Sequence, residues 1–216
     1  MKMKNLTIAL LLLVATQINA QDNKKYVASM VRNIEQLNAA KTADDFTNAA
    51  NSFERIAKVE TKEWLPSYYQ AYALLMVGMQ QADNAKKDEY YDKAGKVAEM
   101  ANTISPDNSE IVTLQSFVTS MKISVDPMTR GQQLAMEAGM LTGMAIKLNP
   151  ENPRPYLLKG TGTMYTPEQF GGGKDKALPI LETAVQKFKA FKPENSLMPT
   201  WGAERATQML EECKKM

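Results

Sequence analysis

Three short segments share one pattern and decide the fold: "ISPDNS" at residues 104–109, "LNPENP" at 148–153 and "FKPENS" at 191–196. Their prolines, Pro106, Pro150 and Pro193, lie 44 and then 43 residues apart, a spacing that indicates stacked supersecondary units. Proline cannot continue a preceding helix, and Asp or Asn can cap the next one. Each copy is therefore predicted to end one helix and begin another.

Small and apolar residues recur at helical spacing between these segments, as in Ala94, Ala98 and Ala101. Alternating β-branched runs bounded by hairpin turns are nearly absent. This pattern predicts an all-α fold of stacked antiparallel helix pairs, in which a last helix caps the stack. The predicted helices cover residues 23–39, 43–60, 65–81, 86–103, 107–124, 129–148, 153–165, 174–191 and 200–215, and "TADD" at Thr42 predicts a capping box.

The first twenty residues have the three parts of a secretory signal peptide. Lys2 and Lys4 precede an apolar run from Leu6, and the small residue Ala20 ends the segment. We expect cleavage near Ala20 and export of residues 21–216 as a single domain, periplasmic or secreted. No cysteine lies near the predicted cleavage site, so we expect no lipid anchor.

The amino-acid composition argues against several classes of function. The 216 residues include no histidine and one cysteine, which removes the commonest general base, the commonest zinc ligand and every Ser-His-Asp or Cys-His arrangement. We therefore predict no catalytic residues, no cofactor and no metal site.

Without Lys2 and Lys4 the 26 basic residues fall to 24, equal to the 24 acidic ones, so nothing resembles the basic surface of a nucleic-acid-binding protein. No later segment is long and apolar enough for a membrane span. Cys213 is interpreted as a small buried residue, although pairing between chains stays open.

The spacing of small residues and proline resembles the tetratricopeptide repeat (TPR). Ala94, Ala101 and Pro106 match the repeat positions, as do Ala138, Ala145 and Pro150. The units exceed 40 residues, longer than the usual 34, because the loops between helices are extended. "EWLPSYYQAY" and "YTPEQFGGGKDKALPILE" also look like a group of exported bacterial TPR-like proteins without an assigned function. A remoter similarity is to the TPR component associated with TRAP transporters.

This resemblance implies a right-handed solenoid whose concave groove binds a protein or peptide partner. By this resemblance, the candidate residues of the groove are Leu74, Phe117, Met121, Leu157, Met164, Tyr165 and Phe170. The predicted function is a non-enzymatic scaffold or binding module. The alternative is a small-molecule-binding accessory protein of a periplasmic transport system. A closed pocket lined by Tyr156, Tyr165, Phe170 and Trp201 would favour the small ligand.

Two further patterns have a structural and a functional interpretation. Met136, Met140 and Met144 recur every four residues, and we interpret them as core packing rather than a soft-metal or partner surface. Gly171–Gly173 precede Lys174, but Glu168 stands where a phosphate-binding loop needs glycine, and Asp175 replaces the Ser or Thr. We therefore predict that the glycines form a turn between two helices.

Overall fold

The computed structural model describes residues 23–215. Within this part, a helix through residues 23–39 is followed by α2 (Ala43–Val59), α3 (Trp64–Gln80), α4 (Asn84–Ile104), α5 (Ser109–Ile123), α6 (Pro127–Leu148), α7 (Arg154–Tyr165), the 3-10 turn η1 (Glu168–Phe170), α8 (Lys174–Ala190) and α9 (Ala203–Lys214). The described residues contain no strand, so the all-α prediction is confirmed. The predicted signal peptide lies outside the described residues.

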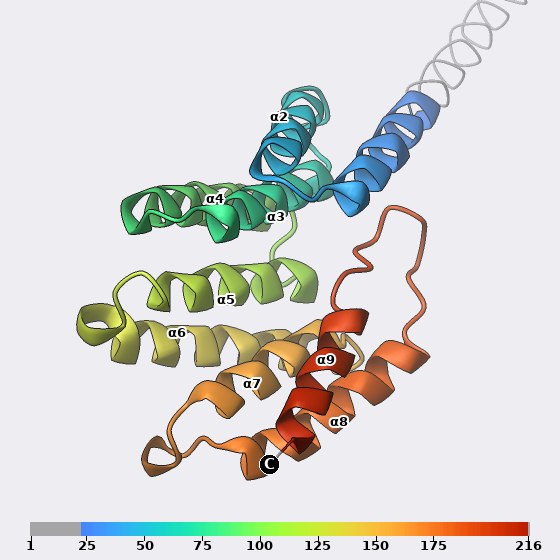
Figure 1. Ribbon diagram of the computed structural model, residues 1–216. Helices are drawn as coiled ribbons and strands as arrows, with labels where there is room; N and C mark the ends of the chain where they lie inside the picture. The colour runs from blue at the N-terminus through green and yellow to red at the C-terminus, as the bar shows by residue number, and fades with distance from the viewer. Residues whose placement is uncertain (1–22, 216) are drawn as a thin grey trace, which may run out of the picture.

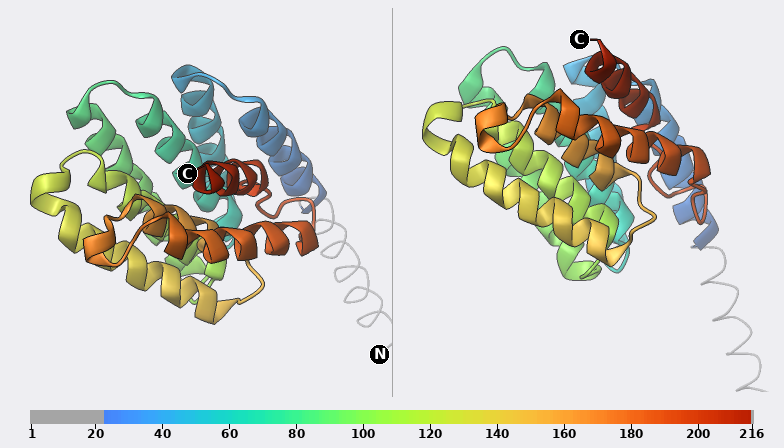
Figure 2. Two further views of the ribbon diagram at one scale, coloured as in Figure 1. Left: turned by 60° about the horizontal axis from the view of Figure 1, so that its bottom comes forward. Right: turned by 90° about the horizontal axis from the view of Figure 1, so that it is seen from below.

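Consecutive helices pack as neighbours, and their pairs are stacked one above another (Figure 1). The most extensive contacts join α2 to α3, α3 to α4, α5 to α6 and α7 to α8. The first helices of successive pairs also touch, since α5 contacts both α3 and α7. The last helix, α9, packs on α8 and also contacts α7, and the view from below shows it alongside α8 (Figure 2). The solenoid handedness and the TPR resemblance stay predictions.

Local sequence signals explain most of the helix ends. The Thr42 hydroxyl accepts a hydrogen bond from the Asp45 backbone N–H, and the Asp45 carboxylate accepts one from the Thr42 N–H, which is the predicted capping box. Asn108 caps α5 in the first repeated segment. In the second, the Asn152 side chain accepts from the Arg154 N–H at the start of α7.

The third repeated segment differs from the prediction. It ends α8, but the next helix begins only at Ala203, where Gly202 provides a left-handed N-cap with φ 108°. The result is a non-helical connection over residues 191–202, which we call the crossing segment. It extends from α8 to the surface of α3 and α5.

The buried apolar side chains form two clusters. The first cluster combines residues from the helix at 23–39 through α5, including Met30, Phe53 and Leu114. The second cluster combines α7, α8 and α9, including Leu181 and Met209. Leu197 of the crossing segment belongs to the first cluster, although it follows α8 in the chain. This segment therefore links the two halves of the molecule.

Side-chain hydrogen bonds cross the contact between α5 and α6. The Ser116 hydroxyl donates to the Ala138 carbonyl at 2.9 Å and lies 2.7 Å from the Thr142 hydroxyl. Ser109 donates in the same way to the Ala145 carbonyl at 2.9 Å. The small residues predicted on this face are thus confirmed as a close helix contact, since Ala138 and Ala145 are buried.

Candidate functional site

The predicted groove residues do not form one surface. Leu74 on α3 and Phe117 and Met121 on α5 are half-buried and pack against the first cluster. Leu157 and Met164 on α7 are instead buried in the second cluster against α8 and α9. Their assignment to an open groove is therefore corrected, because other helices cover them.

The two remaining groove residues are exposed. Tyr165 has 60% and Phe170 has 73% of its surface exposed, at the end of α7 and in η1. The Tyr165 hydroxyl donates to Glu212 of α9 at 3.1 Å. Accordingly, the proposed closed pocket of Tyr156, Tyr165, Phe170 and Trp201 is not formed within residues 23–215, since Trp201 lies with α3 and α5 instead.

The crossing segment covers part of the α3 and α5 surface. The Tyr69 hydroxyl on α3 donates to the Leu197 carbonyl at 2.8 Å. The indole N–H of Trp201 donates to the Tyr68 hydroxyl, also at 2.8 Å. These contacts join positions more than 120 residues apart, and they place a non-helical stretch of the chain on first helices of the stack.

Trp201 stacks against two other rings, and we call these three residues the aromatic stack. The Tyr72 ring centroid lies 5.3 Å from that of Trp201, with 22° between the planes. The Phe117 centroid lies 5.6 Å away, with 30° between the planes. All three side chains are half-buried. Burial raises the pKa of Tyr72 to about 12, and the nearby Arg154 charge opposes this change.

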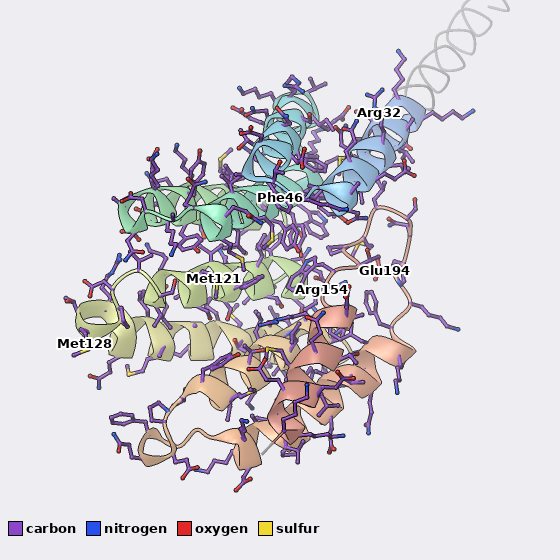
Figure 3. The ribbon with its side chains drawn as sticks, in the orientation of Figure 1. Arg32, Phe46, Met121, Met128, Arg154 and Glu194 are labelled. Carbon is purple, nitrogen blue, oxygen red and sulfur yellow. The ribbon has the colours of Figure 1, made fainter. Side chains whose placement is uncertain are left out.

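A buried ion pair lies next to the aromatic stack. Arg154 at the start of α7 has no exposed surface, and its guanidinium donates to Glu110 of α5 at 2.9 Å. It also donates to the Pro199 carbonyl of the crossing segment and lies 5.4 Å from the centre of the Trp201 ring. Figure 3 shows Arg154 inside the molecule, whereas Met128 and Glu194 lie at its outside. The ion pair therefore joins α5, α7 and the crossing segment.

The electrostatics of this pair follow from its burial. Desolvation raises the pKa of Glu110 above its ordinary value, and the Arg154 charge opposes the rise. One carboxylate oxygen of Glu110 and the Nε of Arg154 are buried without a hydrogen-bond partner in the described structure. Sequence reasoning missed this pair, because nothing in "RPYLL" at residue 154 distinguishes a buried arginine from an exposed one.

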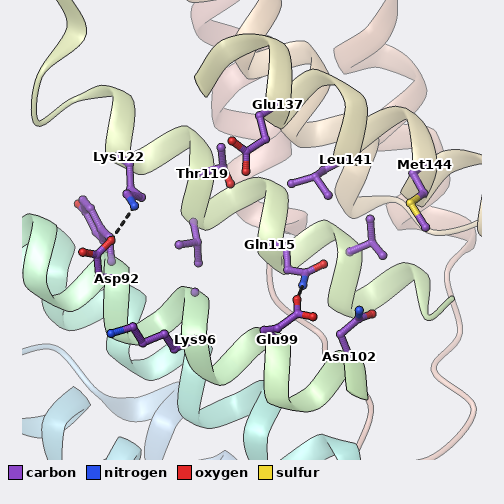
Figure 4. A pocket seen from close by; sticks show the side chains of 14 residues that line it. Asp92, Lys96, Glu99, Asn102, Gln115, Thr119, Lys122, Glu137, Leu141 and Met144 are labelled. Carbon is purple, nitrogen blue, oxygen red and sulfur yellow. Dashed lines mark hydrogen bonds and ion pairs between the residues drawn. The ribbon is translucent and has the colours of Figure 1, made fainter. Parts of the chain in front are cut away.

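A second candidate is an open cleft of about 610 Å³ between α4, α5 and α6 (Figure 4). Its sides carry the Lys122–Asp92 ion pair at 2.6 Å and a hydrogen bond of 2.9 Å from Gln115 to Glu99. Small-molecule sites are mostly apolar with a few polar groups. The charged lining and the openness of this cleft make it a weaker candidate than the aromatic stack.

The methionine row on α6 corrects one sequence interpretation. Met136, Met140 and Met144 are 63%, 67% and 44% exposed, so they are not a core seam. Gly139 and Gly143 do not bring another helix close, since a Cβ at either position would meet nothing within 4 Å. The true packing face of α6 carries Ala138, Thr142 and Ala145. The periodicity was correct, but it cannot tell which face of a helix a neighbour covers.

The glycine-rich stretch forms a turn between α7 and α8, as predicted. Gly173 has φ 103°, a left-handed conformation that favours glycine. Gly172 lies so close to Thr166 that a Cβ would overlap the Thr166 carbonyl oxygen. A depression beside these glycines is lined by two carboxylates, Glu168 and Asp175, and one ammonium, Lys176, so its side-chain charges do not favour an anion.

Residues 23–215 offer neither a cluster of metal-binding side chains nor a membrane-spanning helix. No group of three or more His, Cys, Asp or Glu side chains there could hold a metal ion. No helix in the same residues is long and apolar enough to cross a membrane.

Comparison with known proteins shows a similar solved structure. No family model matches the sequence, and no curated protein matches it either. Among solved structures, the HusA haemophore from Porphyromonas gingivalis superimposes with a TM-score of 0.80 at 34% sequence identity. The match covers 88% of this chain and 92% of HusA. At this identity over nearly the whole of both chains, the chain belongs to the same protein family as HusA.

Proposed function

We propose that this protein is an exported, non-enzymatic haem-binding protein. The observation that carries the proposal is its 34% identity to a haemophore over 92% of that chain. The name of HusA describes a protein that binds haem rather than an enzyme. The absence of histidine and the sequence signs of a signal peptide agree with an exported binding role.

The proposed site is the α3 and α5 surface around the aromatic stack. Aromatic rings stack favourably on flat rings at centroid distances of about 4.5–7 Å. Tyr72 and Phe117 hold the Trp201 indole in this geometry, at 5.3 and 5.6 Å. Met121, a groove residue predicted from the sequence, adds a half-buried apolar side chain one helical turn from Phe117, whereas Leu74 follows Tyr72 by two residues and lies on another face of α3. A flat, largely apolar macrocycle matches this chemistry.

The residues at this surface also limit how iron could be held. Since the chain contains no histidine, an axial ligand would come from another residue type, and both Tyr and Met serve as haem ligands. Met121 follows Phe117 by one helical turn on α5. Its thioether is the ligand candidate at this surface.

A peptide or protein partner is the second candidate function. One observation favours it: residues 197–201 already lie as a non-helical stretch on α3 and α5, held by Tyr68 and Tyr69. The surface of α3 and α5 already binds a stretch of its own chain, so it has the shape and the hydrogen-bond donors to bind a peptide of another chain. A role as an accessory of a periplasmic transport system stays a prediction.

The test is a haemin titration of the protein comprising residues 21–216, followed by the Soret band. We expect a dissociation constant of about 1 µM or tighter. In a Trp201→Ala background, in which Phe117 has lost its stacking partner, Phe117→Leu removes one stacking ring and should weaken haemin binding about two- to tenfold, because a favourable ring pair contributes about 0.5–1.5 kcal/mol. The matched control is Met144→Leu in the cleft between α4, α5 and α6, which should leave the affinity unchanged. Loss of binding in the control alone would move the site to that cleft, and no binding by the wild type would refute the function.

A further inference from the structure

The crossing segment is held on α3 and α5 by side chains: Leu197 and Met198 pack in the first cluster, and Trp201 stacks on Tyr72 and Phe117. Three side-chain hydrogen bonds add to this packing: Tyr69 donates to the Leu197 carbonyl, Trp201 donates to the Tyr68 hydroxyl, and Arg154 of α7 donates to the Pro199 carbonyl. In residues 23–215, no backbone–backbone hydrogen bond joins the segment to α3 or α5. Moving the segment away would therefore break no backbone hydrogen bond of either helix.

The two parts of the segment differ in burial. Residues 192–196 are exposed, whereas Leu197 and Pro199 are buried and Trp201 is half-buried. The exposed part also connects to α8 without any helix of its own. On the α8 side this exposed part can follow a movement of residues 197–201, whereas on the other side Gly202 joins Trp201 directly to α9.

Trp201 has the geometry of a bound flat ligand. Its indole stacks on Tyr72 and Phe117, carries one hydrogen bond to Tyr68, and lies under the Arg154 guanidinium. Phe117 and Tyr72 belong to helices that the first cluster fixes, whereas Trp201 belongs to the non-helical segment. The rings of Tyr72 and Phe117 are thus the fixed part of the binding surface, and the Trp201 indole is the part that can move away.

We propose that Trp201 occupies the place of the flat ligand, and that the ligand binds against Tyr72 and Phe117 after residues 197–201 have moved away. This inference rests on the proposed function. It adds the position at which the macrocycle stacks and the segment that must move away before the macrocycle can bind. It predicts an unusual direction of change in the ligand affinity. If only the open state binds the ligand, the apparent affinity is the intrinsic affinity reduced by the open fraction. Weakening the attachment of the segment should then strengthen binding.

The sharpest test is Tyr69→Phe, which keeps the ring in the core and removes only the hydroxyl that binds Leu197. The loss of one ordinary hydrogen bond should raise the open fraction, and with it the haemin affinity, about fivefold. The control is Tyr26→Phe, which removes a buried hydroxyl that has no hydrogen-bond partner in the described structure. Its haemin affinity should equal that of the wild type. Unchanged or weaker haemin binding by Tyr69→Phe would overturn the inference while leaving the proposed function intact.

Opening can also be measured without any ligand. The protein has two tryptophans, so Trp64→Phe leaves Trp201 as the single tryptophan, which can be excited selectively over the tyrosines. Acrylamide should quench Trp201 more strongly when Tyr69→Phe is added, and equal quenching would contradict a detachable segment. If the wild type fails to bind haemin, the proposed function fails, and Trp201→Ala then decides the inference with metal-free protoporphyrin as a flat probe. Binding gained by this variant supports the inference, and no binding overturns it.

Discussion

Arg154→Met should be among the most destabilising single substitutions in this chain. Arg154 has no exposed surface, and its ion pair with Glu110 has a nitrogen–oxygen distance of 2.9 Å. Methionine fills a similar volume without a charge. The variant leaves the Glu110 carboxylate buried, with its Arg154 partner gone. It also removes the donor to the Pro199 carbonyl.

The magnitude follows from the burial of both groups. Breaking a buried ion pair by removing one partner costs about 3–5 kcal/mol, because the remaining charge is desolvated and uncompensated. In a chain of this size, about 1 kcal/mol lowers the melting temperature by roughly 2–4 °C, so the expected drop is roughly 6–20 °C. Arg154→Met combined with Glu110→Leu should recover most of this loss, since an apolar pair of similar volume is often as stable as a buried ion pair.

The assay is urea unfolding followed by circular dichroism at 222 nm, with the slope checked for two-state behaviour. The control is Arg130→Met, which breaks a pair with Asp88 at 3.0 Å whose side chains are 31% and 30% exposed. We expect about 1 kcal/mol or less there. Equal losses in the two single variants, or an Arg154→Met loss below about 1 kcal/mol, would refute the reasoning.

The pH dependence gives an independent check of the same pair. The Arg154 charge opposes the rise in the pKa of Glu110, so its removal raises that pKa further. A group whose folded pKa lies above its unfolded value stabilises the fold below the unfolded pKa, and this contribution is lost as the pH rises through the folded pKa. The destabilisation of Arg154→Met should therefore shrink as the pH falls and Glu110 becomes protonated. A destabilisation independent of pH would show that the missing charge partner is not its cause.

Three other predictions concern packing. Ala94→Leu and Ala138→Leu place a larger side chain at buried helix contacts, so each should lower the free energy of unfolding by about 1–3 kcal/mol in urea titrations, and an unchanged midpoint in both would contradict the helix packing described. Gly172→Ala should lower the melting temperature because its Cβ would overlap the Thr166 carbonyl, and isothermal titration with phosphate or ATP should detect no binding tighter than about 0.1 mM in either form. The Cys213 thiol is buried and burial raises its pKa, so it should react with a thiol reagent much more slowly in the native protein than in urea, and equal rates would show that the C-terminal packing is absent.

The sequence by itself determined the secondary structure. The observed helix bounds lie at most three residues from the predicted ones, the largest difference being Thr200 predicted and Ala203 observed as the start of the last helix. This accuracy has a local cause. Proline, side-chain caps and the 3.6-residue period act within one or two turns of the backbone, so neighbouring residues contain the information.

Only the tertiary structure decided which helix faces are covered and which residues meet across the chain. The exposure of Met136, the burial of Met164 and the position of Trp201 on α3 and α5 depend on neighbours distant in the sequence. Arg154 is the clearest case: its charge predicts exposure, but Glu110, Pro199 and three aromatic rings surround it in the fold. Periodicity reports that a helix has an apolar face, whereas the partner of that face is set by long-range packing, which no local pattern encodes.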